Sequence, residues 1–382
     1  MSLSRRRMLA ILGGGTVVAA SSFAGYRLSR SPTTAFQPWE MAGSYIEPRR
    51  RALSFALLAP NPHNQQPWLV DLSEPDTVVV YANPEKLLPE TDPLNRQITI
   101  GMGAFFELMR MAAAEDGFRV EFDFFPDGAS PAGLDHRPIA RAVFERDPSL
   151  STDPLFAHAL ARRSNKEPFD TSRPVAPDDV ARLAAAVSPD SRFGATLDPE
   201  EIAFYREMTV DALRVELTTP RTHKESVDVF RIGHREVDAN PDGIDLAGPM
   251  FEGLKLAGLF DREKASDPTS FAFQGGLDAV AAYCTTAMGF VWLVTPENTR
   301  QDQLAAGRDW LRANLAATGL GLGLHPLSQA LQGYPEMKDH HETIHRRLAP
   351  EGGTVQMFGR IGYGPTVGPS PRWTLEHKVV AS

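Results

Sequence analysis

The pattern with the most direct chemical meaning is His341-Glu-Thr-Ile-His345, near the carboxyl end of the chain. On a helix, two histidines four residues apart face the same side and can bind zinc, with the intervening glutamate as general base. A third ligand would have to be Glu351, Glu376, His377 or an upstream residue. The flanking residues 338–347 are polar almost all round, as on a surface helix. We therefore expect a solvated helix here and no bound metal.

The overall composition excludes several classes of function. A length of 382 residues exceeds what one hydrophobic core usually organises, which favours two packed units or one duplicated unit. The formal charge of -9 and the lack of any Lys/Arg run longer than three residues beyond the N-terminal segment argue against nucleic acid as a partner. Cys284 is the only cysteine, so an internal disulfide, a CxxC redox pair and a cysteine-rich zinc site are all excluded.

The hydrophobic periodicity predicts a mixed α and β chain. Helices are expected at residues 49–58, 101–116, 157–163, 177–187, 200–217, 224–237, 300–319 and 336–348, and strands at 68–72, 77–81, 119–124, 138–145, 289–295 and 354–363. Thr299 and Asp302 have the spacing of a helix N-terminal capping pair. The Asp- and Gly-rich residues 240–248 are expected to form a loop that could act as a lid.

The N-terminal segment is predicted to be an export signal. Ser4-Arg-Arg-Arg-Met-Leu9 resembles a twin-arginine signal, and no charge interrupts residues 8–26. Ser22 and Ala24 are small residues at a spacing that suits cleavage after Ala24. The alternative is a membrane anchor that is never cleaved, although Gly13, Gly14 and Gly15 make the run only weakly apolar. We expect export to the periplasm or cell envelope, with membrane contact only through this segment.

A similarity between two segments of the sequence supports a duplicated unit. When residues 103–117 and 305–319 are aligned on their terminal glycines, Gly117 and Gly319, the apolar stripes of the two predicted helices agree in phase. Coincidence is the alternative, because many buried helices share an Ala/Leu face that ends in glycine.

Three further stretches are distinctive in combination. They are Ala59-Pro-Asn-Pro-His-Asn-Gln-Gln-Pro-Trp68, Arg162-Arg-Ser-Asn-Lys166 followed by Phe169, and Thr318-Gly-Leu-Gly-Leu-Gly-Leu-His-Pro-Leu-Ser-Gln329. A weaker fourth is Arg360-Ile-Gly-Tyr-Gly-Pro365, continuing through Pro371 and Arg372. Together they resemble the nitroreductase family, whose members bind FMN between two subunits. The resemblance extends in scattered motifs from about residue 48 to 373.

The order of the motifs is reversed relative to an ordinary nitroreductase, where the Arg-Arg-Ser motif precedes the Asn-x-Gln-Pro-Trp loop. Each motif occurs once here, so a fused chain would build one dimer-type site inside a monomer, with one FMN. The pattern most resembles the two-repeat, nitroreductase-like flavin proteins of mycobacterial dormancy responses. The implied fold is α+β, with two fused half-repeats that each have a mainly antiparallel sheet flanked by helices.

The resemblance implies which residues hold FMN. Guanidinium, ammonium and hydroxyl groups suit the phosphate and ribityl chain, which assigns Arg162, Arg163, Ser164, Lys166 and Arg372. The ring would lie against the loop residues Pro60, Asn61, Pro62, Asn64 and Gln66 and against the turn residues Pro326, Leu327, Ser328 and Gln329. Backbone N–H groups near Ser328 and Gln329 would bond flavin N5, which performs the redox step, so no side chain is assigned as catalytic.

Plainer interpretations stand beside these. Arg162, Arg163 and Lys166 could form a solvated helix end, and Asn64 and Gln66 could be turn residues that satisfy local backbone groups; Trp68 and Tyr363 suit core aromatics, and His63 and His325 suit ordinary polar walls.

The implied function is an FMN-dependent oxidoreductase that passes electrons to a nitroaromatic, quinone or similar acceptor, with NAD(P)H as a candidate donor. The alternative is a protein that sequesters flavin with little or no turnover, which export favours because NAD(P)H is not expected outside the cytoplasm. The expected organisation is a signal and linker at 1–33, a first half at 34–150, and a second half at 151–382 with a lid insertion near 236–275.

Overall fold

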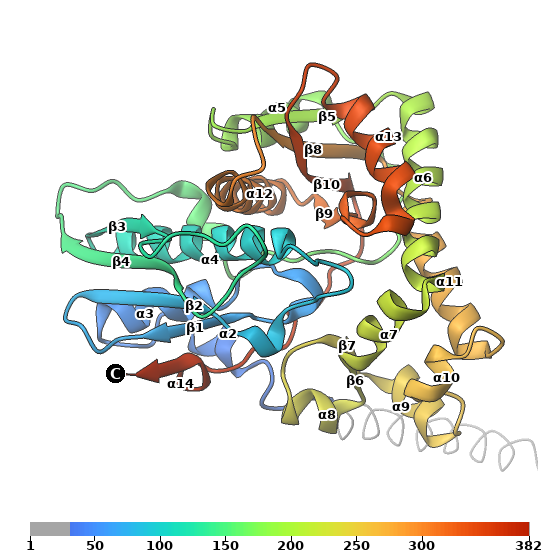
Figure 1. Cartoon of the computed structure of the whole chain (residues 1–382), viewed down its shortest axis with the longest axis horizontal. Coiled ribbons are helices and arrows are strands. Elements are labelled where there is room, and N and C mark those ends of the chain that lie inside the picture. Colours follow the sequence, from blue (N-terminus) through green and yellow to red (C-terminus); the bar gives the residue numbers. More distant parts are fainter. Residues whose placement is uncertain (1–30, 382) are drawn as a thin grey trace, which may run out of the picture.

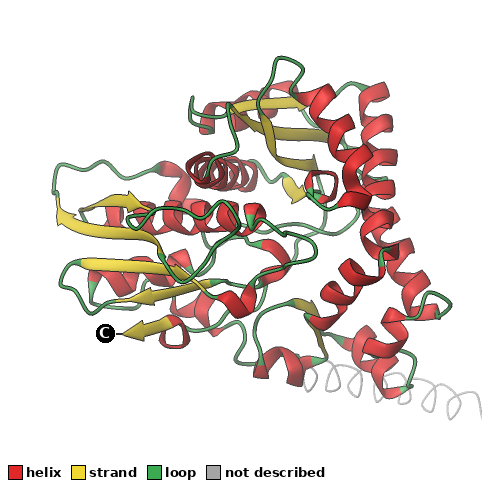
Figure 2. Cartoon of the chain, viewed as in Figure 1, coloured by secondary structure: helices red, strands yellow, loops and turns green. Residues whose placement is uncertain are grey.

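The computed structural model describes residues 31–381, so the predicted signal segment up to residue 30 lies outside the described residues. A five-stranded and a four-stranded sheet occupy opposite sides of the main body, with two long helices between them (Figure 1). A helical lobe with a two-stranded sheet projects from one side (Figure 2). The predicted α+β class is confirmed. No helix among residues 31–381 has the length and apolar character needed to cross a bilayer.

The first half surrounds the five-stranded sheet, whose order is β11-β1-β2-β4-β3. Its elements are α2 (Gln37–Met41), α3 (Pro48–Ala56), η1 (Pro62–Asn64), β1 (Trp68–Asp71), β2 (Thr77–Ala82), η2 (Pro84–Lys86), α4 (Arg96–Glu115), β3 (Phe118–Phe124) and β4 (Pro138–Arg146). The strands β1 to β4 pair antiparallel. Trp68 and Phe105, both fully buried with ring centroids 4.9 Å apart, join the sheet to α4.

The second half surrounds the four-stranded antiparallel sheet, in the order β5-β8-β10-β9. Its elements are η3 (Pro154–His158), α5 (Pro177–Ala186), β5 (Arg192–Thr196), α6 (Pro199–Thr218), β8 (Gly289–Thr295), α12 (Arg300–Gly319), β9 (Gly323–Pro326), η4 (Gln329–Leu331), η5 (Pro335–Met337), α13 (Lys338–Leu348) and β10 (Thr354–Gly362). Tyr205 of α6 packs on the stacked rings of Phe290 and Phe358.

The two halves meet where α4 crosses α12. Gly103 and Gly307 each occupy the eighth position of a twenty-residue helix. A Cβ atom at Gly103 would lie 2.0 Å from the Leu304 carbonyl oxygen, and one at Gly307 would lie 1.9 Å from the Ile100 carbonyl oxygen. Ile100 and Leu304 are themselves equivalent, at the fifth position of each helix. The crossing is therefore reciprocal, as about a pseudo-twofold axis, and only glycine permits it at these two positions.

The crossing at Gly103 and Gly307 corrects the alignment predicted between residues 103–117 and 305–319. Aligning Gly117 with Gly319 displaces the helices by two residues, because Gly319 is the last residue of α12 whereas α4 already ends at Glu115.

The lobe lies between α6 and β8 in the chain. It comprises α7 (Pro220–Asp228), β6 (Phe230–Ile232), α8 (His234–Ala239), β7 (Ile244–Leu246), α9 (Pro249–Leu256), α10 (Arg262–Ser266) and α11 (Phe271–Cys284). Strands β6 and β7 pair in parallel. The predicted continuous helix 224–237 is wrong, because β6 and Gly233, with a φ of 84°, separate α7 from α8.

The tail of the chain returns to the first half. After β10 it passes α14 (Leu375–Lys378) and ends in β11 (Val379–Ala381), which pairs in parallel with β1. On the way, the Arg372 N–H donates to the Ala35 carbonyl oxygen at 2.8 Å. The last residues of the predicted second half thus complete the sheet of the first.

Most other predicted elements are present, and the exceptions have local causes. The predicted helix 157–163 is wrong, because only the short η3 forms before an irregular segment. Helix α4 begins five residues before the predicted start at residue 101, where the Asp92 carboxylate accepts from the Gln97 and Ile98 N–H groups. The capping box of Thr299 and Asp302 is confirmed.

Candidate cofactor-binding site

The loop before β1 has an unusual backbone. His63, Asn64 and Gln66 all have positive φ angles, between 45° and 53°. The Asn61 side-chain oxygen accepts from the Gln66 N–H at 2.7 Å and holds the loop closed. Left-handed conformations in three non-glycine residues are costly and persist where surrounding contacts enforce them.

The amide side chains of this loop bond to the protein itself. Gln66 is fully buried, donates to the Pro241 carbonyl oxygen at 2.7 Å and accepts from the Trp373 N–H at 2.9 Å. Asn64 donates to the Pro371 carbonyl oxygen at 3.0 Å. The prediction that the Gln66 side chain contacts a ligand does not fit these contacts, and the plainer turn interpretation does.

Arg372 acts as a clamp on the same loop. Its guanidinium donates to the carbonyl oxygens of Leu57 at 2.8 Å and Ala59 at 3.1 Å, to Ser370 Oγ at 2.7 Å, and to the Asn64 side-chain oxygen. Every nitrogen of this buried side chain is engaged, so its predicted role as a phosphate ligand does not fit. Burial, together with Arg162 and Arg163, lowers the pKa of Arg372 to about 9.

Arg162 lies next to the clamp and is bonded very differently. Its side chain is 3% exposed, and Nη2 donates to the Leu58 carbonyl oxygen at 3.0 Å. Its Nε and Nη1 atoms are buried without a hydrogen-bond partner, and so is Nε of Arg163. Within residues 31–381 no carboxylate forms an ion pair with Arg162, Arg163 or Arg372.

The guanidinium groups of Arg162, Arg163 and Arg372 lie close together, and no carboxylate balances their positive charge. Burial and the neighbouring Arg163 lower the pKa of Arg162 to about 9. The Arg163 guanidinium is held over the Trp39 ring, 4.4 Å from its centroid. A buried cation with open donors is costly unless an anion accepts from it, so the donor set fits a phosphate.

Lys166 connects this cluster to three other segments. Its side chain is accessible to solvent, yet protein surrounds it closely enough that burial lowers its pKa, with the Asp245 carboxylate of β7 opposing the shift. Burial and Lys166 lower the pKa of His63 to about 4. Burial, Arg360 and Lys166 also lower the pKa of His325. The loop at residue 63, the Arg-Arg-Ser segment, β9 and the lobe therefore converge around one ammonium group.

Arg360 is a site residue that the sequence analysis did not assign. It is fully buried in β10, and its guanidinium donates to the backbone oxygens of Tyr283, Glu167 and Asn165 at 2.6, 2.8 and 3.2 Å. Its Nε donates to His325 Nδ1 at 3.1 Å, so the ring proton of neutral His325 resides on Nε2. The only charged residue of a buried, mostly apolar strand was the available signal.

The turn after β9 presents backbone donors. The Leu327 N–H bonds the Phe358 carbonyl oxygen at 2.9 Å, which fixes the turn to β10. The N–H groups of Ser328 and Gln329 have no acceptor within the part of the chain that the structure describes. Pro326, Leu327, Ser328 and Gln329 thus form a rigid turn with two open donors, whose contact with a flavin ring stays a prediction.

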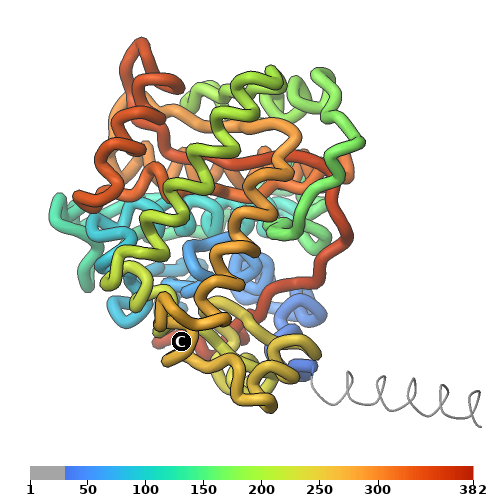
Figure 3. The backbone as a smooth tube through the Cα atoms, turned by 90° about the vertical axis from the view of Figure 1, so that its right-hand side faces the viewer, coloured from blue at the N-terminus to red at the C-terminus, as the bar shows by residue number. Residues whose placement is uncertain are grey.

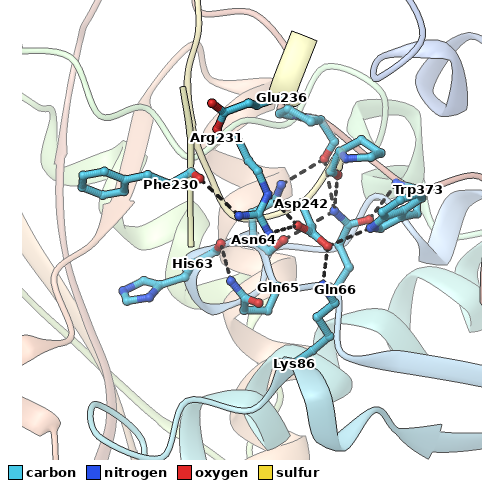
Figure 4. A network of polar contacts seen from close by, with 12 residues as sticks. His63, Asn64, Gln65, Gln66, Lys86, Phe230, Arg231, Glu236, Asp242 and Trp373 are labelled. Carbon is cyan, nitrogen blue, oxygen red and sulfur yellow. Dashed lines mark hydrogen bonds and ion pairs between the residues drawn. The ribbon is translucent and has the colours of Figure 1, made fainter. Parts of the chain in front are cut away.

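Residues 240–243, the first part of the predicted lid loop, are held in place by hydrogen bonds and ion pairs. Asp242, which is fully buried, accepts from Lys86 Nζ at 2.7 Å, Arg231 Nη2 at 2.6 Å and Trp373 Nε1 at 2.8 Å (Figure 4). The Gly243 N–H also bonds the Asn64 carbonyl oxygen at 3.1 Å. Residues 240–243 are therefore held against the loop before β1, and the lid role expected for residues 240–248 stays a prediction.

The His-Glu-x-x-His segment lies on α13. The His345 ring bonds the His341 carbonyl oxygen through Nδ1 at 2.8 Å, and its Nε2 accepts from the Val355 N–H at 3.2 Å. Both ring nitrogens of His345 are occupied by backbone groups, so it has no lone pair to offer a metal. Among residues 31–381 no cluster of three or more His, Cys, Asp or Glu side chains could hold a metal ion.

Comparison with known proteins gives distant relatives. No protein-family model matches the chain. A Mycobacterium tuberculosis protein named as a candidate NAD(P)H nitroreductase is 23% identical over 343 residues, which cover 86% of this chain and 90% of the relative. A second, likewise named and called acg, is 30% identical over 121 residues, or 31% of this chain and 35% of the relative.

Among solved structures, the FMN-dependent nitroreductase NfnB of Mycobacterium smegmatis in complex with NADPH is 18% identical, with a TM-score of 0.34 over 56% of this chain and 92% of that one.

Proposed function

We propose that the chain is a nitroreductase-like flavoprotein that binds one FMN where the two halves and the lobe meet. One observation carries the proposal: Arg162 and Arg163 together hold three buried guanidinium nitrogens without partners, beside an accessible Lys166. A phosphate monoester supplies the negative charge and acceptor oxygens that this cluster lacks. The full-length similarity to a mycobacterial protein named for nitroreductase activity supports the same conclusion.

The chain's own groups divide between the two ends of such a cofactor. Arg162, Arg163, Ser164 and Lys166 hold the phosphate and ribityl end. The loop at Pro60, Asn61 and Pro62 and the turn from Pro326 to Gln329 border the ring, where the open N–H groups of Ser328 and Gln329 are donors. The bound flavin supplies hydride and electron transfer, which none of these side chains can perform. Arg372, Asn64 and Gln66 position the loop.

The reaction proposed is the oxidation of NAD(P)H and the reduction of a nitroaromatic, a quinone or a similar acceptor. The relatives named for NAD(P)H nitroreductase activity favour the nicotinamide donor. The second candidate is flavin storage, favoured by the pinned wall at Asp242, which closes one side of the site.

Two further parts of the proposal concern organisation and location. The proposed organisation is a fused pseudo-dimer of the dormancy-associated type that acts as a monomer; the reciprocal crossing of α4 and α12 supports its pseudo-dimer part. The twin-arginine pattern supports export, with residues 8–26 either removed or retained as an anchor.

The test is titration of the full chain with FMN, followed by absorbance and flavin fluorescence. The double variant Arg162→Ala, Lys166→Ala should raise the Kd at least about tenfold, because two charge-assisted contacts are lost. Arg182→Ala, an exposed arginine on α5, is the matched control. Equal affinities in all three proteins would remove the phosphate assignment.

Anaerobic NADPH then separates the two functions. Bleaching of the flavin band, with recovery on adding a nitroaromatic, supports the reductase. A band that stays unbleached supports storage.

A further inference from the structure

Strands β9 and β10 place one histidine opposite one arginine. His325 and Arg360 are direct partners in the antiparallel register, so their side chains lie on the same face of the sheet. Arg360 Nε donates to His325 Nδ1 at 3.1 Å. A guanidinium has donors and no acceptor, so Nδ1 must offer its lone pair and the ring proton of neutral His325 is on Nε2.

The Arg360 side chain is itself held in one orientation. Its Nη1 donates to the Tyr283 carbonyl oxygen at 2.6 Å, in the last turn of α11, and its Nη2 donates to those of Glu167 and Asn165 at 2.8 and 3.2 Å. Helix α11 runs from the lobe to the second half alongside α6 (Figure 3). The last carbonyl groups of a helix lack partners within it, so a cation at this end is stabilising. Because all three nitrogens are engaged, Arg360 is fixed in the position that meets His325.

The second ring nitrogen of His325 is open to a ligand. The residue is 5% exposed, and no group among residues 31–381 accepts from Nε2. Unlike Nδ1 of His63, this atom is not fully enclosed by protein. The Tyr283 ring packs edge to face on the imidazole, with 5.0 Å between the ring centroids. Burial and the cations Arg360 and Lys166 lower the pKa of His325, so the ring is neutral at neutral pH.

The surroundings of this N–H donor indicate its ligand. His325 directly precedes Pro326, the first residue of the turn whose open N–H groups border the proposed flavin ring. Lys166, at the proposed phosphate and ribityl end, forms no hydrogen bond or ion pair in the part of the chain that the structure describes. No carboxylate there forms an ion pair with His325 either. A site rich in donors and poor in acids suits an electron-rich acceptor, such as a carbonyl oxygen or nitrogen of the flavin ring.

We propose that His325 donates from Nε2 to the ring of bound FMN, and that Arg360 is the positioning residue that fixes this tautomer. The inference rests on the proposed FMN site, and it adds a side-chain donor to the two backbone donors of the turn. Without Arg360, a neutral imidazole has two tautomers, and one of them presents a lone pair to the ligand. With Arg360 in place, the same atom is always a donor.

The first test is NMR of the full chain with isotopically labelled histidine and without FMN. The signals of His325 are assigned by their absence in His325→Gln. We expect the neutral tautomer with the proton on Nε2, unchanged between about pH 5 and pH 8. The other tautomer, or a ring that becomes cationic within this range, would overturn the role of Arg360.

The second test is FMN titration of three variants, each checked for folding by circular dichroism. His325→Leu removes the donor and should raise the Kd about tenfold, whereas His325→Gln retains an N–H donor and should stay within about threefold of the wild type. The control is His136→Gln, an exposed histidine before β4, which should leave the Kd unchanged.

The outcomes separate this inference from the FMN site itself. Equal affinity in the wild type and His325→Leu, while the double variant Arg162→Ala, Lys166→Ala binds more weakly, would overturn the role of His325 and leave the FMN site standing. A wild type that binds no FMN would overturn both. If His325→Leu does not fold, a Kd for His325→Gln as weak as that of the double variant would count against the donor role, and the NMR test needs only the wild type and His325→Gln.

Discussion

Arg372 and Arg162 are two almost fully buried arginines that meet at one backbone oxygen, that of Leu58, and are otherwise opposites. The nitrogens of Arg372 are all engaged by protein oxygens, whereas Arg162 leaves two buried nitrogens without a partner. Burial alone therefore does not separate a structural arginine from a ligand-binding one. The difference lies in whether the fold itself satisfies the donors.

A third buried group carries the opposite charge and is also left uncompensated. Glu216 of α6 is 4% exposed, its carboxylate accepts from Gln332 Nε2 at 2.7 Å, and no Lys, Arg or His within residues 31–381 forms an ion pair with it. Ser226 Oγ and Tyr334 OH, near it on α7 and before η5, are buried and unbonded. This part of the second half satisfies its polar groups far less completely than the clamp around Arg372.

Of the changes considered, removal of the Arg372 side chain should lower the free energy of unfolding most. Arg372→Ala leaves the Leu57 carbonyl oxygen and the Asn64 side-chain oxygen without this donor and removes one of the two donors to the Ala59 carbonyl oxygen, so we expect the free energy of unfolding to fall by about 4 kcal/mol. Denaturant unfolding followed by circular dichroism measures this change. A loss below about 1 kcal/mol, similar to that of the exposed control Arg182→Ala, would show that the clamp contributes little.

The next largest loss of stability should come from raising the pH, because Glu216 then loses its proton. Burial, only partly offset by hydrogen bonds from Gln332 and Gln329, raises the pKa of Glu216 from 4.5 to about 7. The folded state therefore holds this proton more tightly than the unfolded chain. The resulting stability is fully present below pH 4.5 and is lost as the pH rises through 7, by about 3 kcal/mol.

The measurement is the difference between wild type and Glu216→Gln across that range. The variant has no proton to lose, so its stability relative to wild type should increase with pH. Parallel pH profiles for the two proteins would mean that Glu216 titrates normally.

The smallest effect on stability should come from Arg162. Arg162→Met loses one hydrogen bond but also an uncompensated buried charge, so we expect a change within about 1 kcal/mol without added anion. Inorganic phosphate should raise the Tm of the wild type and leave that of the variant unchanged. A loss as large as that for Arg372→Ala would erase the distinction between the two arginines.

The helices and strands with a strong periodicity of hydrophobic residues were predictable from the sequence. Strand β8 and the capping box of α12 depend on local pattern alone. The short strands β6, β7 and β11 were not predictable, because three residues carry no period and their pairing partners are distant in the chain. The continuous helix expected across residue 233 failed because the glycine there adopts a positive φ that no neighbouring residue indicates.

The candidate site was predictable by residue type more than by role. Arg162 and Arg372 have the same chemistry in the sequence. Both bond the Leu58 carbonyl oxygen, and only the folded chain shows that Arg372 alone also bonds those of Leu57 and Ala59. The role of Gln66 was also not predictable, because its hydrogen-bond partners Pro241 and Trp373 lie far along the chain. The contacts of Asp242, in the loop that was expected to act as a lid, could not be foreseen because its partners Lys86 and Trp373 belong to other elements.

The pairing of β11 with β1 has a consequence for the order of events during synthesis. Residues 379–381 are the last described, and they form the edge strand next to residues 68–71. The first sheet therefore stays one strand short until residues 379–381 have been synthesised. All four strands of the second sheet precede β11 in the chain, so the sheet that begins first along the chain is the last to receive its edge strand.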